Sequence, residues 1–271
     1  MKLTEIPTGK KKVAVISPVA HSGKTTVATL LAQIMGSYNE LQCVLTYAGD
    51  HEEEYEYALG FEDDNSVAHS LTQIVQLLKH NRLSAEHLTD YMEVISNNTW
   101  LLKASAPDVS EHDAQELFKY MLGEIDMNVT FIDCVKPLED KLTQYVLSQA
   151  DITLIVVDSS TQSILKMEKW FNEDKYDELL PPDDKIIYVV NNYDPTVANI
   201  TSVAKRLGVK ARDLIVLNHS PYIGKLTAEQ RLQEILPPIL ENDGGVYDIA
   251  SQLKEAGDMI AGILGFGTRK G

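Results

Sequence analysis

The residues with the clearest chemistry stand near the start of the chain, in the run Ser22-Gly23-Lys24-Thr25-Thr26. An apolar stretch precedes this run and apolar residues at helical spacing follow it, so the run joins a predicted strand to a predicted helix. That is the place and composition of the second half of a phosphate-binding loop, whose N–H groups and helix end bind polyphosphate. In such a site Lys24 reaches the β- and γ-phosphates, the Thr25 hydroxyl binds Mg²⁺ and Thr26 touches an inner phosphate.

The first half of this loop departs from the full pattern, G-x-x-x-x-G-K-[ST]. Pro18 stands where the first glycine is expected, and proline fixes φ and supplies no N–H. The loop must therefore begin in a different way. The alternative is a chance Gly-Lys-Thr at a strand–helix junction.

Two acidic residues follow other predicted strands. Asp133 closes the apolar run 129–132, which is the form of a Walker B carboxylate that holds Mg²⁺ directly or through water. Its alternative role is to cap the following turn. Asp50 comes shortly after the strand at 43–47 and is a candidate to orient an attacking water, or is one more acid in an acidic segment.

Two amide side chains follow a further apolar run, at 186–190. Asn191 and Asn192 begin the sequence Asn-Asn-Tyr-Asp-Pro. A side-chain amide both donates to and accepts from the edge of a nucleobase, so these residues are candidates to contact adenine. The alternative is a turn rich in Asn, Asp and Pro.

Strands alternate with helices along the chain, which predicts an α/β fold: a single P-loop NTPase domain with a mostly parallel twisted sheet and helices on both faces. The carboxyl ends of such strands are where ligands bind. Strands are expected at 13–16, 43–47, 100–102, 129–132, 152–157, 186–190 and 214–217. Helices are expected at 25–35, 67–79, 114–122, 162–171, 203–207 and 228–240.

Composition limits the kinds of partner. The 271 residues carry a formal net charge of −16, which argues against a broad phosphate-binding surface, so there is no strong case for nucleic acid. A compact basic cluster, Lys205, Arg206, Lys210 and Arg212, is interpreted as a solvated surface. No apolar run reaches the roughly 18 residues of a transmembrane helix.

The two cysteines are expected to be buried and reduced, which fits a cytoplasmic protein. Cys43 and Cys134 each lie in or beside an apolar run, and no C-x-x-C is present. The histidines have no zinc-ligand spacing. We expect one domain over 1–271, ending in a helix at about 246–266.

The order of these motifs resembles the ParA/MinD family of P-loop ATPases over about residues 12–240. The matching segments are 22–26 with the end of K-G-G-x-G-K-T-T, 44–50 with the strand ending in D-x-D, 99–105 with "nLwllpas", 131–133 with "iiD", 150–158 with "AD.vilv..p" and 189–195 with "vlNryd". The resemblance implies ATP and Mg²⁺ as cofactors, with loop residues His21 to Thr26 on the phosphates, Asn191 at adenine and Asp50 linked to hydrolysis.

Several positions depart from the family pattern. The lysine that reaches across the family's dimer to the partner's nucleotide would fall at Val19, and the two following glycines at Ala20 and His21. The first acid of D-x-D is Ala48, whereas the second is kept as Asp50. Such losses resemble atypical members that localise pili and secretion systems, the TadZ/CpaE branch, and imply slow hydrolysis or none.

The C-terminal helix has an apolar face. This face, formed by Ile260, Ile263, Leu264 and Phe266, is a candidate docking surface, with packing on the domain as the alternative. Acidic residues on the polar face disfavour anionic lipid, so peripheral membrane contact is possible but not favoured.

These observations predict an ATP-binding switch, a weak ATPase at most, that positions or assembles a larger machine through protein contacts, with a homodimer as a candidate state. One alternative is a module that holds nucleotide without turnover. Another is a metabolic P-loop ligase of the dethiobiotin-synthetase type. Fold alone does not separate them.

Overall fold

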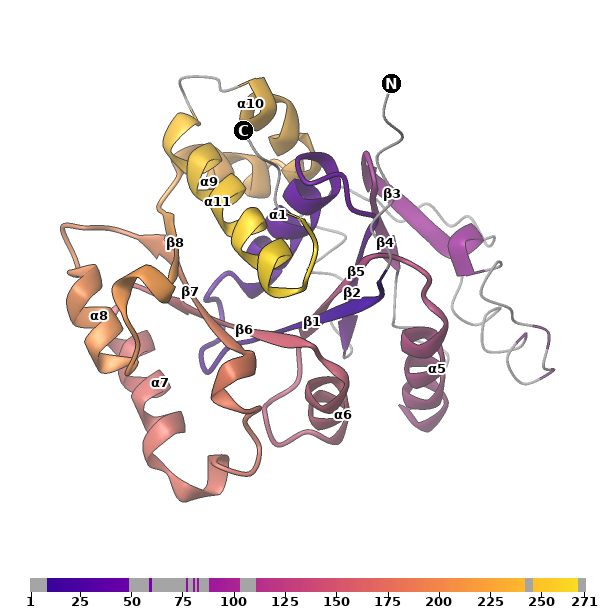
Figure 1. The fold of residues 1–271 in the computed structure, drawn as a ribbon, viewed down its shortest axis with the longest axis horizontal. Coiled ribbons are helices and arrows are strands. Elements are labelled where there is room, and N and C mark those ends of the chain that lie inside the picture. Colours follow the sequence, from indigo (N-terminus) through magenta and orange to yellow (C-terminus); the bar gives the residue numbers. More distant parts are fainter. Residues whose placement is uncertain are drawn as a thin grey trace.

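An eight-stranded sheet forms the centre of the protein (Figure 1). The computed structural model describes residues 9–48, 88–102, 111–241 and 246–267, with the single positions 59, 77, 80 and 82. The strands are β1 Lys11–Ile16, β2 Cys43–Ala48, β3 Met92–Ser96, β4 Thr99–Leu102, β5 Val129–Cys134, β6 Ile152–Asp158, β7 Ile186–Tyr193 and β8 Ile215–Asn218. Their order across the sheet is β3-β4-β2-β5-β1-β6-β7-β8, and all neighbours are parallel except β3 and β4.

Helices cover both faces of this sheet, which confirms the predicted fold class (Figure 1). One face carries α1 Lys24–Ser37, α9 Pro221–Ala228, α10 Leu236–Glu241 and α11 Tyr247–Ile263. The other carries α5 Glu111–Glu124, α6 Lys141–Gln149, α7 Thr161–Asn172 and α8 Ile200–Arg206. Short 3₁₀ helices span Thr89–Tyr91, Asp174–Tyr176, Asp183–Lys185, Ala211–Asp213 and Leu232–Ile235.

Helix α1 lies in the core and fixes the end of the phosphate loop. Every residue from 27 to 36 is buried, because the sheet lies on one side and α11 on the other. Two glycines permit this packing. A Cβ at Gly36 would lie 2.2 Å from the Thr99 hydroxyl, and one at Gly257 of α11 would lie 2.9 Å from Ile34 Cγ2. The second half of α1 is therefore closely packed between the sheet and α11.

Two parts of the sequence fold differently from expectation. Strand β3 was not predicted; it forms an antiparallel edge hairpin with β4 through Asn97 and Asn98, and Asn98 has φ 58°. Two Asn residues between apolar runs were the available hairpin signal. The single helix expected at 228–240 is wrong: α9 ends at Ala228, and α10 begins only at Leu236.

A left-handed residue and two prolines explain the break in that helix. Gln230 has φ 59°, and the Arg231 N–H donates to the Leu226 carbonyl at 2.8 Å, which ends α9. Pro237 and Pro238 lack N–H groups and lie in the first turn of α10, where helices tolerate proline. Helix α9 also has a proline, Pro221, in its first turn. Its N-cap is Ser220, whose hydroxyl accepts from the Ile223 N–H at 3.4 Å. The helix expected at 67–79 lies outside the described residues except for position 77.

The C-terminal helix packs on the domain, as the alternative interpretation expected. Ile260 is fully buried, Leu264 and Phe266 are 5% and 7% exposed, and Ile263 alone of the four candidate docking residues is exposed, at 49%. The predicted docking surface is therefore wrong, because three of its four side chains fill the core. No helix in the described ranges has the length and apolar character needed to cross a membrane.

Candidate nucleotide site

The loop between β1 and α1 is built by local contacts that replace the missing glycine. The Ser17 hydroxyl accepts from the Val19 N–H at 3.1 Å and donates to the Val19 carbonyl at 3.0 Å, so it braces the turn around Pro18. Two residues further along, His21 and Gly23 have positive φ values of 59° and 83°. Such turns direct successive N–H groups into one concave surface, which suits an anion.

Gly23 occupies the cap position of α1 and offers no side chain to the first N–H groups of the helix. The first turn contains no acidic residue. These N–H groups and the positive end of the helix dipole therefore remain available to a negatively charged ligand.

Three side chains meet where this helix begins. The Lys24 ammonium donates to Asp133 Oδ1 at 3.0 Å and to the Cys134 carbonyl at 2.6 Å. The Thr25 hydroxyl donates to the other carboxylate oxygen, Asp133 Oδ2, at 2.8 Å. Asp133 lies near the end of β5, opposite Val15 of β1, and its side chain is only 1% exposed. The sheet register thus brings together residues that are 108 and 109 positions apart.

A fourth element reaches the loop from β7. The Asn191 amide donates to the Ser22 carbonyl at 3.0 Å. The same amide nitrogen would lie 2.2 Å from a Cβ at position 23, so Gly23 leaves the space that Asn191 occupies. Asn191 therefore supports the loop from the side of β7.

The residues present fit a nucleotide–magnesium complex. A hydroxyl and a carboxylate, Thr25 and Asp133, offer the oxygen ligands that Mg²⁺ prefers, and Mg²⁺ typically takes only one or two carboxylates beside phosphate and water. The Ser22 hydroxyl is buried with no hydrogen-bond partner in the described part of the chain, as expected of a group that faces a ligand. No group of three His, Cys, Asp or Glu side chains suited to a metal occurs among the described residues.

The remaining predicted site residues are less engaged. His21 is exposed at the loop and Thr26 is partly buried in the first turn of α1. Asn192 is exposed with φ 49°, and its carbonyl accepts from the Ser159 hydroxyl at 3.3 Å. Asp50 lies outside the described residues.

Two contacts in the site were not among those predicted from the sequence. The Cys134 carbonyl accepts from Lys24, and a backbone oxygen leaves no signal in the sequence. The Ser17 brace did have a signal, since a serine before a proline favours a turn.

Both cysteines are buried free thiols, as predicted. Burial raises the pKa of the Cys134 thiol to about 12, and the neighbouring Asp133 charge adds to this effect. Burial raises the pKa of the Cys43 thiol as well. Both thiols pack within the sheet, in β2 and β5.

The basic cluster is a solvated surface, in agreement with the prediction. Arg206 forms a two-point ion pair with Glu168, with distances of 2.6 and 2.7 Å. The Arg206 guanidinium lowers the pKa of the Glu168 carboxyl. Arg212 is 77% exposed and lies 3.6 Å from Asp213.

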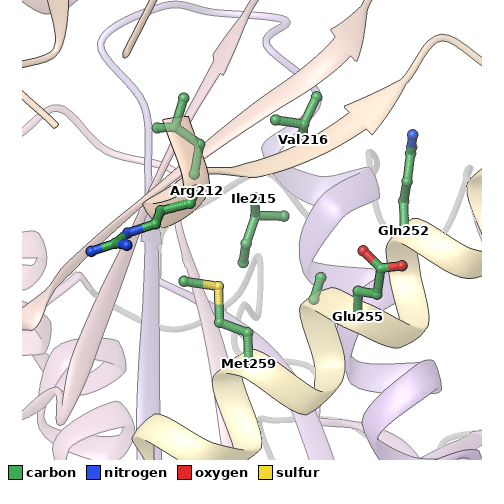
Figure 2. Close-up of a pocket in the computed structure, with 8 residues that line it drawn as sticks. Arg212, Ile215, Val216, Gln252, Glu255 and Met259 are labelled. Atoms are coloured by element: carbon green, nitrogen blue, oxygen red, sulfur yellow. The ribbon is translucent and has the colours of Figure 1, made fainter. Parts of the chain in front are cut away.

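A pocket of about 360 Å³ lies away from the loop between β1 and α1, between the edge strand β8 and α11 (Figure 2). Arg212 and Glu255 stand at its rim, and Ile215 and Met259 line its apolar part. Gln252 accepts from the Asn218 N–H at 2.7 Å and so covers one end of the strand edge. The pocket shares no residue with the loop, and its few polar groups do not converge on one point.

Comparisons with known proteins place the fold. No protein-family model matches the chain, and no curated protein matches its sequence. Among solved structures, a ParA family ATPase from Chlorobium tepidum has a TM-score of 0.67 at 15% identity, covering 89% of this chain and 97% of that one. MinD in a MinC:MinD complex from Aquifex aeolicus has a TM-score of 0.66 at 14% identity, covering 93% of this chain and 96% of that one. MinD with Mg-ADP from Pyrococcus horikoshii has a TM-score of 0.62 at 18% identity, covering 94% of this chain and 98% of that one.

A plasmid partition protein from Borrelia burgdorferi bound to AMPPNP is also similar, with a TM-score of 0.60 at 16% identity over 91% of this chain and 99% of that one. At these identities the likeness concerns the fold. The chain has the architecture of the ParA and MinD ATPases, with Lys24, Thr25 and Asp133 gathered at the strand ends where α/β folds bind their ligands.

Proposed function

We propose that this chain binds ATP together with Mg²⁺ and works as a nucleotide-dependent switch of the ParA/MinD type. One observation carries the proposal: the Lys24 and Thr25 side chains meet the buried carboxylate of Asp133 at 3.0 and 2.8 Å, at the start of α1. A lysine, a hydroxyl and a carboxylate around a strand–loop–helix are the parts that P-loop proteins use. The likeness to a MinD with Mg-ADP and a partition protein with AMPPNP supports it.

The contacts of Lys24 suggest how the switch is set. Its ammonium has three N–H donors, and Asp133 and the Cys134 carbonyl hold it through two hydrogen bonds. Phosphate oxygens compete for these donors, so nucleotide binding transfers Lys24 from the end of β5 to the phosphates. Asp133 Oδ1 then loses its hydrogen bond from Lys24, and Asp133 and Thr25 would hold Mg²⁺, which when bound neutralises phosphate charge. The segment after Cys134 thereby has two arrangements, one for each state of the site.

The output of the switch is proposed to be contact with proteins. The net charge of −16 disfavours DNA and anionic membrane. The similar Aquifex MinD was solved in complex with MinC, which supports a protein partner. Val19 stands where the family has its cross-dimer lysine, so a homodimer of this chain would have to be held by other contacts. The loss of that lysine and of the first acid, at Ala48, favours a role like that of the TadZ/CpaE branch.

Nucleotide titration by calorimetry tests the binding site. ATP is expected to bind in the presence of Mg²⁺, more tightly than GTP, because no N-K-x-D sequence follows β7. Asp133→Asn should abolish the dependence on Mg²⁺ while the fold, followed by circular dichroism, is retained. Tighter binding of GTP, or no binding of either nucleotide by the unaltered protein, would contradict the proposal.

Turnover assays separate the switch from its alternatives. We expect hydrolysis to be slow, with Asp50 responsible for most of it, because one fixed charge at a transition state is worth on the order of 10²- to 10³-fold in rate. A rapid rate in the purified protein that Asp50→Ala leaves unchanged would contradict this role. Turnover that requires a small carboxylate or amine would favour a ligase. Solution mass with and without nucleotide tests the dimer.

A further inference from the structure

The Asn191 side chain is buried against the loop between β1 and α1, and contact with a base would not require this position. It is 7% exposed, and its amide nitrogen donates to the Ser22 carbonyl at 3.0 Å. The strand bends here: pairing of β7 with β8 shifts register between Val190 and Tyr193, and Asn192 has φ 49°. The irregular end of β7 therefore coincides with the side chain that contacts the phosphate loop.

The direction of this hydrogen bond has a consequence for the neighbouring amide. The described part of the chain has no cis peptide, so the carbonyl of Ser22 and the N–H of Gly23 point in opposite directions. Because Asn191 holds the carbonyl toward β7, the Gly23 N–H is directed away from β7. An N–H held in this direction is available to a phosphate that lies above the start of α1.

Gly23 and Asn191 depend on each other for space. A Cβ at position 23 would lie 2.2 Å from the amide nitrogen of Asn191, and the φ of 83° also favours glycine. Gly23 thus leaves space for the Asn191 amide and also adopts the positive φ that the turn requires. In return, the Asn191 amide provides a hydrogen-bond donor for the backbone carbonyl of Ser22, a buried residue.

We propose that Asn191 is a positioning residue for the phosphate loop, whose amide fixes the Ser22–Gly23 peptide before a ligand arrives. The inference rests on the proposed nucleotide function and deepens it. A loop held in its binding conformation loses less freedom on binding, so affinity for phosphate itself depends on Asn191. The family resemblance instead assigns the matching residue to contact with adenine. If Asn191 positions the loop, its loss should weaken binding of a ligand that has phosphates but no base. If Asn191 only contacts adenine, binding of that ligand should not change.

Inorganic tripolyphosphate with Mg²⁺ is the probe that separates them. Asn191→Leu keeps the approximate size of the side chain and removes its donor, leaving the Ser22 carbonyl without its partner. We expect the affinities for tripolyphosphate and for ATP to fall by the same factor, about tenfold or more, as for a lost hydrogen bond beside a buried group. Asn172→Leu makes the same change at an exposed position of α7, where the amide donates to the Glu168 carbonyl at 2.7 Å, and should change neither affinity.

The outcomes are distinct. Weaker ATP binding with unchanged tripolyphosphate binding would overturn the positioning role and leave the proposed function intact. No binding of either ligand by the unaltered protein would overturn both.

Hydrogen exchange gives a second readout that needs no ligand and suits a smaller variant. In Asn191→Ala, the backbone amides of residues 19–23 should exchange faster than in the unaltered protein, by about tenfold, while those of β6 stay the same. Equal exchange in the loop would overturn the inference, even if the leucine variant does not fold.

Discussion

The start of α1 and the length of α11 are neighbours on the same face of the sheet, yet they use their side chains in opposite ways (Figure 1). At the start of α1, polar groups from β5, β7 and the loop converge on Lys24 and Ser22. Along α11, the apolar face that resembled a docking surface fills the core, with Ile260 fully buried. An apolar stripe on a helix predicts that the stripe is covered. It does not predict whether the rest of the domain or a partner protein covers it.

The pocket beside α11 extends this comparison. It is a hollow of about 360 Å³ with scattered polar groups, whereas the phosphate loop is a place where named donors and acceptors meet within 3.0 Å (Figure 2). A binding site is marked by convergent polar groups as much as by empty space. This convergence favours the loop over the pocket as the place of the proposed nucleotide binding.

The largest expected effect concerns burial on α11. Ile260→Ala should lower the free energy of unfolding by about 2–5 kcal/mol, because it removes a fully buried side chain and leaves a cavity. Ile263→Ala, three residues away on the 49% exposed side, should change it by less than about 0.5 kcal/mol. Urea unfolding of both variants measures the difference. Equal losses would mean that Ile263 is also covered, for instance by a second copy of the chain.

The next prediction separates the loop from the pocket. Lys24→Ala should weaken ATP binding by about a hundredfold, since hydrogen bonds to charged groups contribute about 1.5–3 kcal/mol each. Arg212→Ala, at the rim of the pocket, should leave the affinity unchanged. Calorimetry of the two variants, with thermal unfolding as a check of the fold, is the measurement. A loss in the Arg212 variant alone would move the nucleotide to the pocket.

A pair of helical glycines tests the contact between α1 and α11. A Cβ at Gly257 would lie 2.8 Å from Asn39 Oδ1 and 2.9 Å from Ile34 Cγ2, so Gly257→Ala should destabilise the fold by about 1–3 kcal/mol. Gly224→Ala in α9 meets nothing within 4 Å and should stabilise it by about 0.5–1 kcal/mol. Melting temperatures that move in the same direction for both would argue against the close packing.

The smallest expected signal is the slow reaction of the thiols. Because burial and Asp133 raise the pKa of Cys134 to about 12, its thiol stays protonated at pH 8, and iodoacetamide should label it far more slowly in the native protein than in urea. A raised pKa in the folded state means that the stability it contributes is complete below the unfolded pKa of about 9 and is lost as the pH rises toward 12. Fast labelling of the native protein at pH 8 would indicate that the end of β5 opens readily.

The sequence by itself determined the class of fold and the identity of the residues around the loop. Alternation of apolar runs and amphipathic segments is a local property, and a buried parallel sheet requires it, so the strands β1, β2, β4, β5, β6, β7 and β8 were all anticipated. The motif at Lys24 and Thr25 is local in the same sense, because a strand–loop–helix turn is built from consecutive residues.

Only the tertiary structure decided which of these residues meet. The contact of Lys24 with Asp133 depends on strand register across 109 positions, and that of Asn191 with Ser22 on the bent end of β7 across 169. The same holds for α11, whose apolar face is covered because α1 and β8 lie beneath it. Periodicity fixes which side of an element is apolar; the packing of distant elements fixes what that side touches.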